Sequence, residues 1–416
     1  MSTANDCPSD PRQPPLEVEA ALATLLTQAQ PLAGRETLAT ESALGRVLAV
    51  PVLAGVDLPG WDNSAMDGYA LRHADLGPGG ARLRVSQRIT AGRVGTPLAP
   101  VSAARIFTGA PLPPGADTVV VQEVCRCEGD WVEIPAGIIL GANIRRRGED
   151  LRAGTQVLAA GTLLEPQHLG LAAAVGAARL TLHPRLRVAV LASGDELVPP
   201  GEPLGPGQIY NSNRYLLFGL LQRLGCEVLD LGQVPDQLAA TRTALAAAAT
   251  QADLILTSGG VSVGEEDHIR PAVAQLGRLD LWQVAMRPGK PLAFGHIGAT
   301  PVIGSPGNPV SLFVTFVLFA RPFIRRLQGM AEAGAPRQIS ARAGFALARP
   351  PKRRDYQRAR LGRDTAGAPV VEVFPSQSSA ALTSLTWADG LVQLDAGRRI
   401  APGDPVAFIP FSELLD

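Results

Sequence analysis

The chain has 416 residues, which is long enough for about three domains of ordinary size. Hydrophobic residues make up 46% and charged residues 18% of it, so it can bury a substantial core and is not a disordered protein. The 38 basic and 38 acidic residues cancel, which argues against a general nucleic-acid-binding or anionic-membrane surface. Its 44 glycines and 36 prolines indicate many tight turns and short strands.

Cysteine usage and hydropathy predict a soluble protein of the reducing cytoplasm. The chain has four cysteines, Cys7, Cys125, Cys127 and Cys226, which are too few for disulfide bonds to stabilise a chain of this length. Cys125 and Cys127 lack a second pair at zinc-ligand spacing, so we expect free thiols. The polar N-terminal residues do not resemble a signal peptide. The longest apolar run, Val310–Ala320, is shorter than the about 20 residues that cross a bilayer.

The first half of the chain predicts two kinds of domain. Residues 1–15 are polar and Pro-rich and are expected to form a disordered leader. An amphipathic helix begins at Leu16, and we assign residues 16–53 and 147–185 to one connector domain of helical and extended segments. Between them, residues 54–146 contain short β-rich runs separated by Pro and Gly turns, which is typical of an inserted barrel-like β module.

Residues 186–334 have the pattern of a doubly wound α/β domain. Continuous apolar runs such as RVAVLAS and DLILTS alternate with helical stretches, which indicates a parallel sheet covered on both faces. The expected helices are 213–224, 237–250, 267–276 and 309–327. Residues 335–416 return to β-rich runs and predict a C-terminal β domain. The whole chain is therefore predicted to be a multidomain α/β plus β protein.

Ligands of open α/β sheets bind beyond the carboxyl ends of the strands, so the segments that follow the strands are candidate site residues. These segments are Ser193–Glu196, Asp236, Ser258–Asp267, Arg287–Pro291 and Gly304–Pro309. Their glycine-rich turns suit an anion, because backbone N–H groups can approach it closely. Their carboxylates suit a hard cation such as Mg²⁺. A phosphorylated ligand bridged by a metal ion satisfies both requirements.

Each of these features has a structural alternative. The 258–264 segment matches neither a dinucleotide fingerprint nor a Walker loop and could be an ordinary glycine turn. Asp236 could cap the following helix, Lys290 could be a surface lysine, and Arg145–Arg147 could be a solvated face. No histidine pair has zinc-ligand spacing, and no nucleophile elbow or catalytic triad is visible.

Seven motifs in a fixed order resemble the molybdopterin molybdenumtransferase family of the MoeA type. The motifs are Asp62–Ala70, Arg105–Pro111, Asn143–Asp150, Ser193–Leu197, Ser258–Gly264, Arg287–Pro291 and Pro306–Pro309. They extend over most of the chain, and their order makes the match far more specific than any one of them.

The resemblance implies a transferase that uses Mg²⁺ to convert adenylylated molybdopterin and molybdate into molybdenum cofactor and AMP. It also implies an elongated homodimer, with a cleft between the α/β domain of one subunit and the β module of the other. A contact with the molybdopterin adenylyltransferase would fit this role. Neither nucleic acid nor membrane is expected as a partner.

The residues of this chain that correspond to the family's motifs carry its expected roles. The catalytic set is Asp67, Thr108, Asp150, Glu196, Asp236 and Asp267, of which Asp67 and Thr108 rest on the resemblance alone. Glu196, Asp236 and Asp267 are expected to hold Mg²⁺, directly or through water. The substrate-binding set is Ser193, Gly259, Gly260, Ser262, Gly264, Arg287, Lys290, Pro306, Gly307, Asn308 and Pro309.

Three positions depart from the family pattern. Arg287 stands where the family often has Lys, and Ser193 where Thr is common. Gln377-Ser378-Ser379 replaces the usual Gln-Gly-Ser turn of the C-terminal domain. Two other functions stay open, a molybdopterin adenylyltransferase and a molybdopterin-binding scaffold without catalytic activity.

Overall fold

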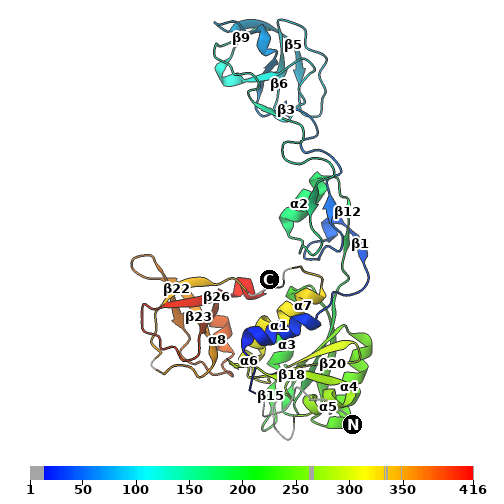
Figure 1. Ribbon diagram of the computed structural model, residues 1–416, viewed down its shortest axis with the longest axis vertical. Helices are drawn as coiled ribbons and strands as arrows, with labels where there is room; N and C mark the ends of the chain where they lie inside the picture. The colour runs from blue at the N-terminus through cyan, green and yellow to red at the C-terminus, as the bar shows by residue number, and fades with distance from the viewer. Residues whose placement is uncertain (1–13, 262–266, 332, 334–335, 348, 416) are drawn as a thin grey trace, which may run out of the picture.

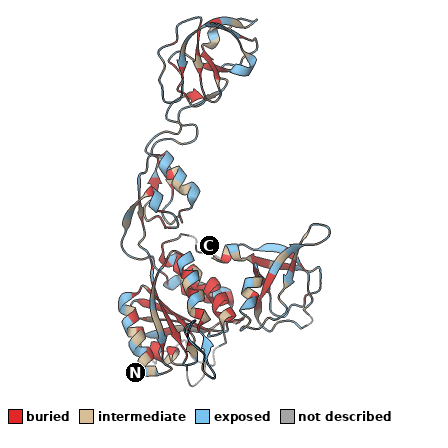
Figure 2. Ribbon diagram, turned by 180° about the vertical axis from the view of Figure 1, so that it is seen from behind, coloured by how far each residue is buried: buried red, intermediate tan, exposed pale blue. Residues whose placement is uncertain are grey.

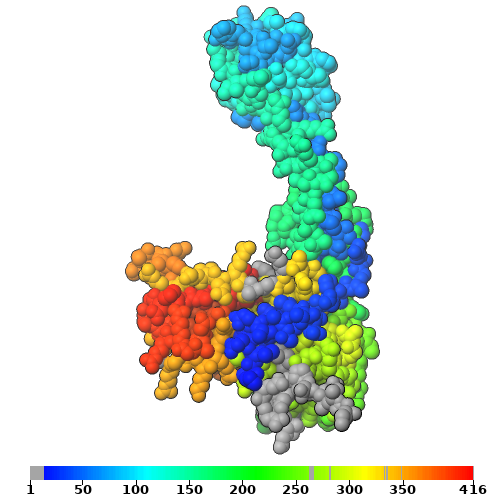
Figure 3. Space-filling model, in the orientation of Figure 1, coloured from blue at the N-terminus to red at the C-terminus, as the bar shows by residue number. Residues whose placement is uncertain are grey.

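The computed structural model describes residues 14–261, 267–331, 333, 336–347 and 349–415. The molecule is elongated, with a β module at one end, a slender connector in the middle, and the α/β domain beside the C-terminal β domain at the other end (Figure 1). The space-filling view shows how narrow the connector is between the two larger parts (Figure 3). None of the described helices is long and apolar enough to cross a bilayer.

The α/β domain is built on a six-stranded sheet. In the order in which they lie, its strands are β16 (Glu227–Val234), β13 (Arg187–Ser193), β17 (Leu254–Ser258), β21 (Thr300–Ser305), β20 (Pro291–Ile297) and β18 (Arg278–Gln283). The first four are parallel, β20 runs antiparallel to them, and β18, which is antiparallel to β20, again has the direction of the first four. Every residue of β17 and β21 is buried, because helices cover both faces of the sheet.

The two helical layers enclose separate apolar cores, and buried positions follow the sheet and the helices that face it (Figure 2). One layer contains α1 (Val18–Gln28), α3 (Ser212–Arg223), α6 (Pro309–Thr315) and α7 (Arg321–Leu327), with a π-helical turn, η4 (Phe316–Ala320), joining α6 to α7. The other contains α4 (Leu238–Gln251) and α5 (Ile269–Leu276). This architecture confirms the predicted doubly wound fold.

Helix α1 packs differently from its assignment by sequence. The sequence pattern predicts that residues 16–53 belong to the connector, but Val18, Ala21 and Leu25 of α1 are buried in the core of the α/β domain. Apolar residues recur along one side of α1, and its neighbours there are η4 and α7. The periodicity predicts the helix but does not reveal which apolar surface it covers.

The connector joins segments that are far apart in the sequence. β1 (Glu36–Ala39) pairs with β12 (Arg179–Leu182), β2 (Val52–Leu53) pairs with β11 (Gln156–Leu158), and α2 (Pro166–Ala174) packs beside them. Two chain segments then continue into the β module through the short pair β3 (Asn63–Ser64) and β10 (Ile144–Arg145).

The β module is a six-stranded sheet with apolar cores on both of its faces. Its strands, in order, are β7 (Thr118–Val121), β4 (Gly68–Leu71), β6 (Ser102–Ile106), β5 (Ala81–Ile89), β9 (Trp131–Ile134) and β8 (Arg126–Glu128). The predicted β runs of this region are therefore confirmed. Cys125 and Cys127 of this module and Cys226 of the α/β domain carry free thiols, as expected.

The C-terminal β domain contains a closed barrel of five strands. β23 (Arg354–Arg363), β24 (Pro369–Val373), β22 (Ile339–Ala343), β26 (Pro405–Pro410) and β25 (Gly390–Leu394) form the ring, which a β25–β23 pairing closes. A short strand of the α/β domain, β19 (Met286–Arg287), adds to β23. The helices α8 (Thr383–Trp387) and α9 (Phe411–Leu415) belong to the same part of the chain.

Candidate functional site

A pocket of about 410 Å³ lies at the carboxyl ends of β13, β17 and β21. Parallel strands of an open sheet end on the same edge, so the loops that follow them converge there. Nine of the predicted site residues line this pocket: Ser193, Glu196, Asp236, Gly259, Gly260, Asp267, Gly307, Asn308 and Pro309. Motifs that are separated by as many as about 115 residues in the sequence therefore meet in one pocket, as the rule for α/β sheets predicts.

Asp236 is held in place by the neighbouring loop. The Ser193 hydroxyl donates a hydrogen bond of 2.5 Å to Oδ1 of Asp236, and the backbone N–H of Asp195 donates one of 3.1 Å to Oδ2. The Asp195 carboxylate in turn accepts the backbone N–H of Asp236 at 3.1 Å. Nε2 of His268 lies 3.0 Å from the backbone carbonyl of Asp236.

This arrangement decides one of the open alternatives. The N-cap position of α4 is Gln237, which makes no side-chain capping bond, so Asp236 does not cap the helix. Its carboxylate instead fixes the loop after β13 against the loop after β16. Asn308 occupies the N-cap position of α6 without a side-chain capping bond, and Pro309 begins the helix as predicted.

The glycine turn after β17 brings two loops into close contact. Gly259 has a φ of +85°, and a Cβ atom placed on it would lie 2.6 Å from the carbonyl oxygen of Ser193. Gly260 has a φ of +68°, and a Cβ there would lie 2.8 Å from Cγ1 of Ile269. Both glycines are thus required by backbone conformation and by space. Ser262 and Gly264, which are also predicted to bind substrate, lie outside the described residues.

The donor atoms around the pocket are of the type that binds Mg²⁺, but in the part of the chain that the structure describes they are too few in one place to hold the ion without further ligands. Carboxylate oxygens of Glu196, Asp236 and Asp267 are the hard ligands that this ion prefers, and all three residues line the pocket. Among the described residues, however, no group of three or more His, Cys, Asp or Glu side chains is close enough to hold a metal ion. Mg²⁺ usually binds through one or two carboxylates, waters and substrate phosphates, so the residues fit an ion that arrives with a phosphorylated substrate.

Two residues that the sequence analysis missed complete the pocket wall. Asn213, near the start of α3, donates hydrogen bonds from Nδ2 to Oγ of Ser258 at 2.8 Å and to the carbonyl oxygen of Gly307 at 2.6 Å. Asn211 caps the same helix by accepting the backbone N–H of Arg214. The sequence predicts only that a helix begins in this segment. An asparagine at a helix start can be a capping residue or a pocket residue, and a single sequence does not distinguish the two.

Arg287 and Lys290 do not line the pocket. Arg287 belongs to β19, and its Nη1 lies 3.8 Å from Oδ2 of Asp355, a buried carboxylate of β23. Burial raises the pKa of Asp355, and the hydrogen bond from Gln357 and the nearby guanidinium of Arg287 oppose that rise. Lys290 is exposed, and Pro306 is buried next to the pocket-lining Gly307.

Asp67 and Thr108 lie together in the β module. The Asp67 carboxylate accepts the backbone N–H and the hydroxyl of Thr108, each at 2.8 Å. These two hydrogen bonds, the backbone one first, lower the pKa of Asp67 below 3.8. Asp150 is exposed on the segment that leaves the β module. The β module that carries Asp67 and Thr108 lies at the opposite end of the molecule from the α/β domain (Figure 1).

The arginine run 145–147 stabilises the neck, the two chain segments that join the connector to the β module. Arg146 pairs with Asp62 at 2.7 Å, and Arg147 pairs with Asp57 at 2.5 Å. Asp62 also accepts the backbone N–H of Arg147, which is the main reason that its pKa is lowered. Two of the three arginines are therefore engaged by aspartates of the neck.

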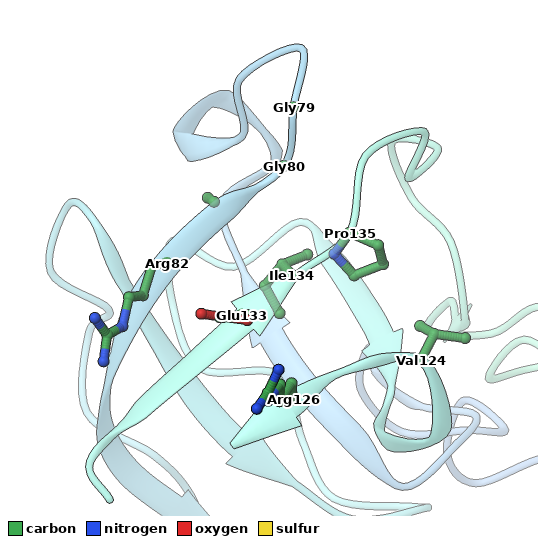
Figure 4. A pocket seen from close by; sticks show the side chains of 9 residues that line it. Gly79, Gly80, Arg82, Val124, Arg126, Glu133, Ile134 and Pro135 are labelled. Atoms are coloured by element: carbon green, nitrogen blue, oxygen red, sulfur yellow. The ribbon is translucent and has the colours of Figure 1, made fainter. Parts of the chain in front are cut away.

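A second pocket, of about 470 Å³, lies on the β module between the turn before β5 and the strands β8 and β9 (Figure 4). Arg82, Arg126 and Glu133 line it, and none of the predicted site residues does. Arg82 and Arg126 both lie within 4 Å of the Glu128 carboxylate. Their charges are thus already partly balanced.

Comparison with known proteins agrees with the fold and with the order of the motifs. Three family models match: the MoeA N-terminal region (domains I and II) at residues 16–176, a probable molybdopterin-binding domain at 189–326, and the MoeA C-terminal region (domain IV) at 340–411. A molybdopterin molybdenumtransferase of Haemophilus influenzae is 39% identical over 386 residues, covering 91% of this chain and 95% of that protein. A Nostoc protein of the same name is 40% identical over 76% of this chain and 74% of its own length.

Solved structures agree as well. A molybdopterin biosynthesis MoeA protein from Pyrococcus horikoshii superimposes with a TM-score of 0.82 at 25% identity, covering 95% of this chain and all of that one. A second structure of a protein with this description and source has a TM-score of 0.78 at 28% identity and covers 96% of this chain and 99% of that chain. The chain belongs to the molybdopterin molybdenumtransferase, or MoeA, family.

Proposed function

We propose that the protein inserts molybdenum from molybdate into adenylylated molybdopterin and releases AMP, in a reaction that depends on Mg²⁺. The observation that carries this proposal is the convergence of three carboxylates and two glycine-rich loops on one pocket of the α/β domain. Carboxylates alone would repel a phosphorylated ligand, by about 4 kcal/mol for unit charges 4 Å apart at an effective dielectric constant near 20. A divalent ion between them removes that conflict.

Among Glu196, Asp236 and Asp267, one or two carboxylates would hold the Mg²⁺ ion directly and the rest through water, and the ion neutralises charge on the phosphoanhydride when it is bound. Ser193 and Asp195 keep the Asp236 carboxylate in one orientation, so it costs little to order when the substrate arrives. Gly259 lets the loop after β17 approach the loop after β13, and its neighbours offer backbone N–H groups to the phosphates.

The β module would complete this site from a second subunit. Asp67 and Thr108 belong to the β module, which lies at the opposite end of the molecule from the α/β domain (Figure 1), and Asp150 belongs to the segment that leaves that module. A homodimer in which each β module reaches the partner's α/β domain places both sets of residues in one cleft. Arg287 and Lys290 would add positive charge near the entrance for molybdate, which is an anion and a substrate.

The test is a single-turnover assay with the purified full-length protein, adenylylated molybdopterin, molybdate and MgCl₂, in which AMP release is followed over time. We expect AMP release that requires molybdate and that EDTA abolishes. Asp267→Asn should reduce it by about 100-fold or more, because the metal ion that this carboxylate helps to hold neutralises charge that develops in the transition state. Glu227→Gln is the matched control, because Glu227 is an exposed carboxylate at the other end of β16.

Two outcomes would contradict the proposal. Undiminished AMP release by Asp267→Asn would exclude the role of this carboxylate. Consumption of ATP with unmodified molybdopterin, without any molybdate-dependent AMP release, would instead identify an adenylyltransferase.

A further inference from the structure

Asn213 joins three walls of the pocket. It lies near the first turn of α3 and is 8% exposed. Its Nδ2 donates one hydrogen bond to Oγ of Ser258, at the end of β17, and another to the carbonyl of Gly307, in the loop after β21. Thus a single amide group fixes a helix start, a strand end and a loop, all of which line the same pocket.

The carbonyl of Gly307 fixes the orientation of this amide, because a carbonyl oxygen can only accept a hydrogen bond. The NH₂ end of Asn213 must therefore face Gly307 and Ser258. Oδ1 of Asn213 points away from both and is buried without a partner among the described residues. The arrangement thus leaves a polar atom unsatisfied, which a folded protein tolerates rarely.

The same orientation fixes the role of Ser258. Its Oγ accepts a hydrogen bond from Asn213, so its own proton is directed elsewhere. Ser258 is 3% exposed and lines the pocket, and in the described part of the chain no group accepts its proton. A buried hydroxyl with an unused proton at the wall of a polar pocket suits a ligand that accepts hydrogen bonds.

We propose that Ser258 donates a hydrogen bond to an anionic oxygen of the substrate's phosphoanhydride and that Asn213 is the positioning residue that orients it. The inference rests on the proposed function for the identity of the substrate. The donor would act beside the glycine turn after β17, where the N–H of Gly259 already donates to the carbonyl of Ser305. The carboxylates and their metal ion would act on the remaining oxygens.

The experiment measures binding of magnesium pyrophosphate, the simplest phosphoanhydride, to the full-length protein by isothermal titration calorimetry. Removal of one hydrogen bond to a charged oxygen should weaken binding by about 10-fold to 100-fold in Ser258→Ala. Asn213→Asp should weaken it to a similar extent, because a carboxylate cannot donate to Gly307 and would accept the Ser258 proton itself. The double variant should bind no more weakly than Ser258→Ala, because Asn213 acts through Ser258.

Thr257→Val is the matched control. Thr257 is the preceding residue of β17, its hydroxyl is buried and unpartnered among the described residues, and the variant replaces that hydroxyl with a methyl group of similar size. It should bind pyrophosphate as the wild type does. A merely structural role for Ser258 would lower the melting temperature without a selective loss of binding.

The kinetic readout separates this inference from the proposed function. In steady-state measurements of AMP release, Ser258→Ala should raise KM for adenylylated molybdopterin more than it lowers kcat, because the contact is present in the ground state. Pyrophosphate binding that is equal in wild type and Ser258→Ala, or absent from both, overturns the inference whatever the turnover. Pyrophosphate binding that depends on Ser258 in a protein without AMP release would support the phosphate contact and contradict only the proposed function.

Discussion

The carboxylate of Asp67 accepts two hydrogen bonds from one residue, Thr108, through the backbone N–H and the hydroxyl, both at 2.8 Å. Both donors favour the charged form, so the pKa of Asp67 lies below 3.8 in the folded protein. Thr108→Val removes the hydroxyl and keeps the backbone N–H. The pKa of Asp67 should then rise toward 3.8 without reaching it, which a carboxyl-carbon NMR titration would detect.

Thr108→Ser keeps the hydroxyl and is the control, with an expected Asp67 pKa close to that of the wild type. The sign of the shift also has a consequence for activity. A lowered pKa means that Asp67 loses its charge only when the pH falls below 3.8. Any pH dependence of AMP release near neutrality should therefore survive Thr108→Val unchanged. An Asp67 pKa that is equal in Thr108→Val and wild type would show that the hydroxyl bond is not formed in solution.

The fold was largely predictable because its strands and helices differ in the spacing of their apolar residues along the sequence. Continuous apolar runs such as Leu254–Ser258 belong to strands buried on both faces, and the structure places this run at the centre of the sheet. The position of α1 was not predictable. The apolar side of a helix indicates that it packs against another apolar surface, but the same pattern is compatible with a surface in the connector or in the α/β core.

The pocket was predictable to the extent that it follows from strand ends. Ser193 ends a parallel strand, and Asp236 and Gly259 come shortly after two others, so the rule for α/β sheets brings them together. Asn213 follows no strand of that sheet directly and enters the pocket only because α3 packs beside β13. Arg287 shows the converse, since a short strand pairing with the C-terminal domain places it beside Asp355.

The separation of the two proposed catalytic sets within one chain predicts complementation between inactive subunits. Asp67→Asn alters the β module and Asp267→Asn alters the pocket of the α/β domain, at opposite ends of the molecule (Figure 1). Each variant alone should be nearly inactive. In a shared-cleft homodimer, half of the sites in a mixed dimer are intact, so co-expression in equal amounts should restore about a quarter of wild-type activity.

A pair of variants within one set provides the control. Asp236→Asn mixed with Asp267→Asn should stay inactive, because both changes fall in the same pocket and no dimer then contains an intact site. Equal recovery of activity in the two mixtures would mean that the recovery does not come from a cleft shared between subunits. Absence of recovery in the first mixture, with dimers present by light scattering, would mean that the sets do not work together.

Gly259→Ala should separate binding from stability. Its left-handed backbone conformation costs an alanine about 1–2 kcal/mol, and the added Cβ would also push against the Ser193 carbonyl from 2.6 Å. Gly298→Ala is a matched control, since Gly298 has a φ of +60° with open space around it in the turn between β20 and β21. Both variants should lose stability in urea denaturation, Gly259→Ala by more because of the clash, but only Gly259→Ala should raise KM for adenylylated molybdopterin. An unchanged KM in Gly259→Ala would show that the contact between the two loops is not needed for binding.

The buried carboxylate of Asp355 should give stability an unusual dependence on pH. Burial raises its pKa above 3.8, so between 3.8 and the folded value the folded state binds more protons than the unfolded state. The contribution of Asp355 to the free energy of unfolding therefore falls as the pH rises through that window and is constant above it. Most carboxylates that accept hydrogen bonds behave in the opposite way, as Asp62 does with its lowered pKa.

Asp355→Asn should remove this contribution, because an amide does not titrate in that range. The difference in unfolding free energy between variant and wild type, measured by urea denaturation at a series of pH values from 4 upward, should change in favour of the variant as the pH rises and then level off. Glu372→Gln, at an exposed position of β24 in the same barrel, should show no such change. A difference that is independent of pH for Asp355→Asn would mean that Gln357 and the guanidinium of Arg287 offset the whole effect of burial, and that the link between β19 and β23 holds a charged pair throughout.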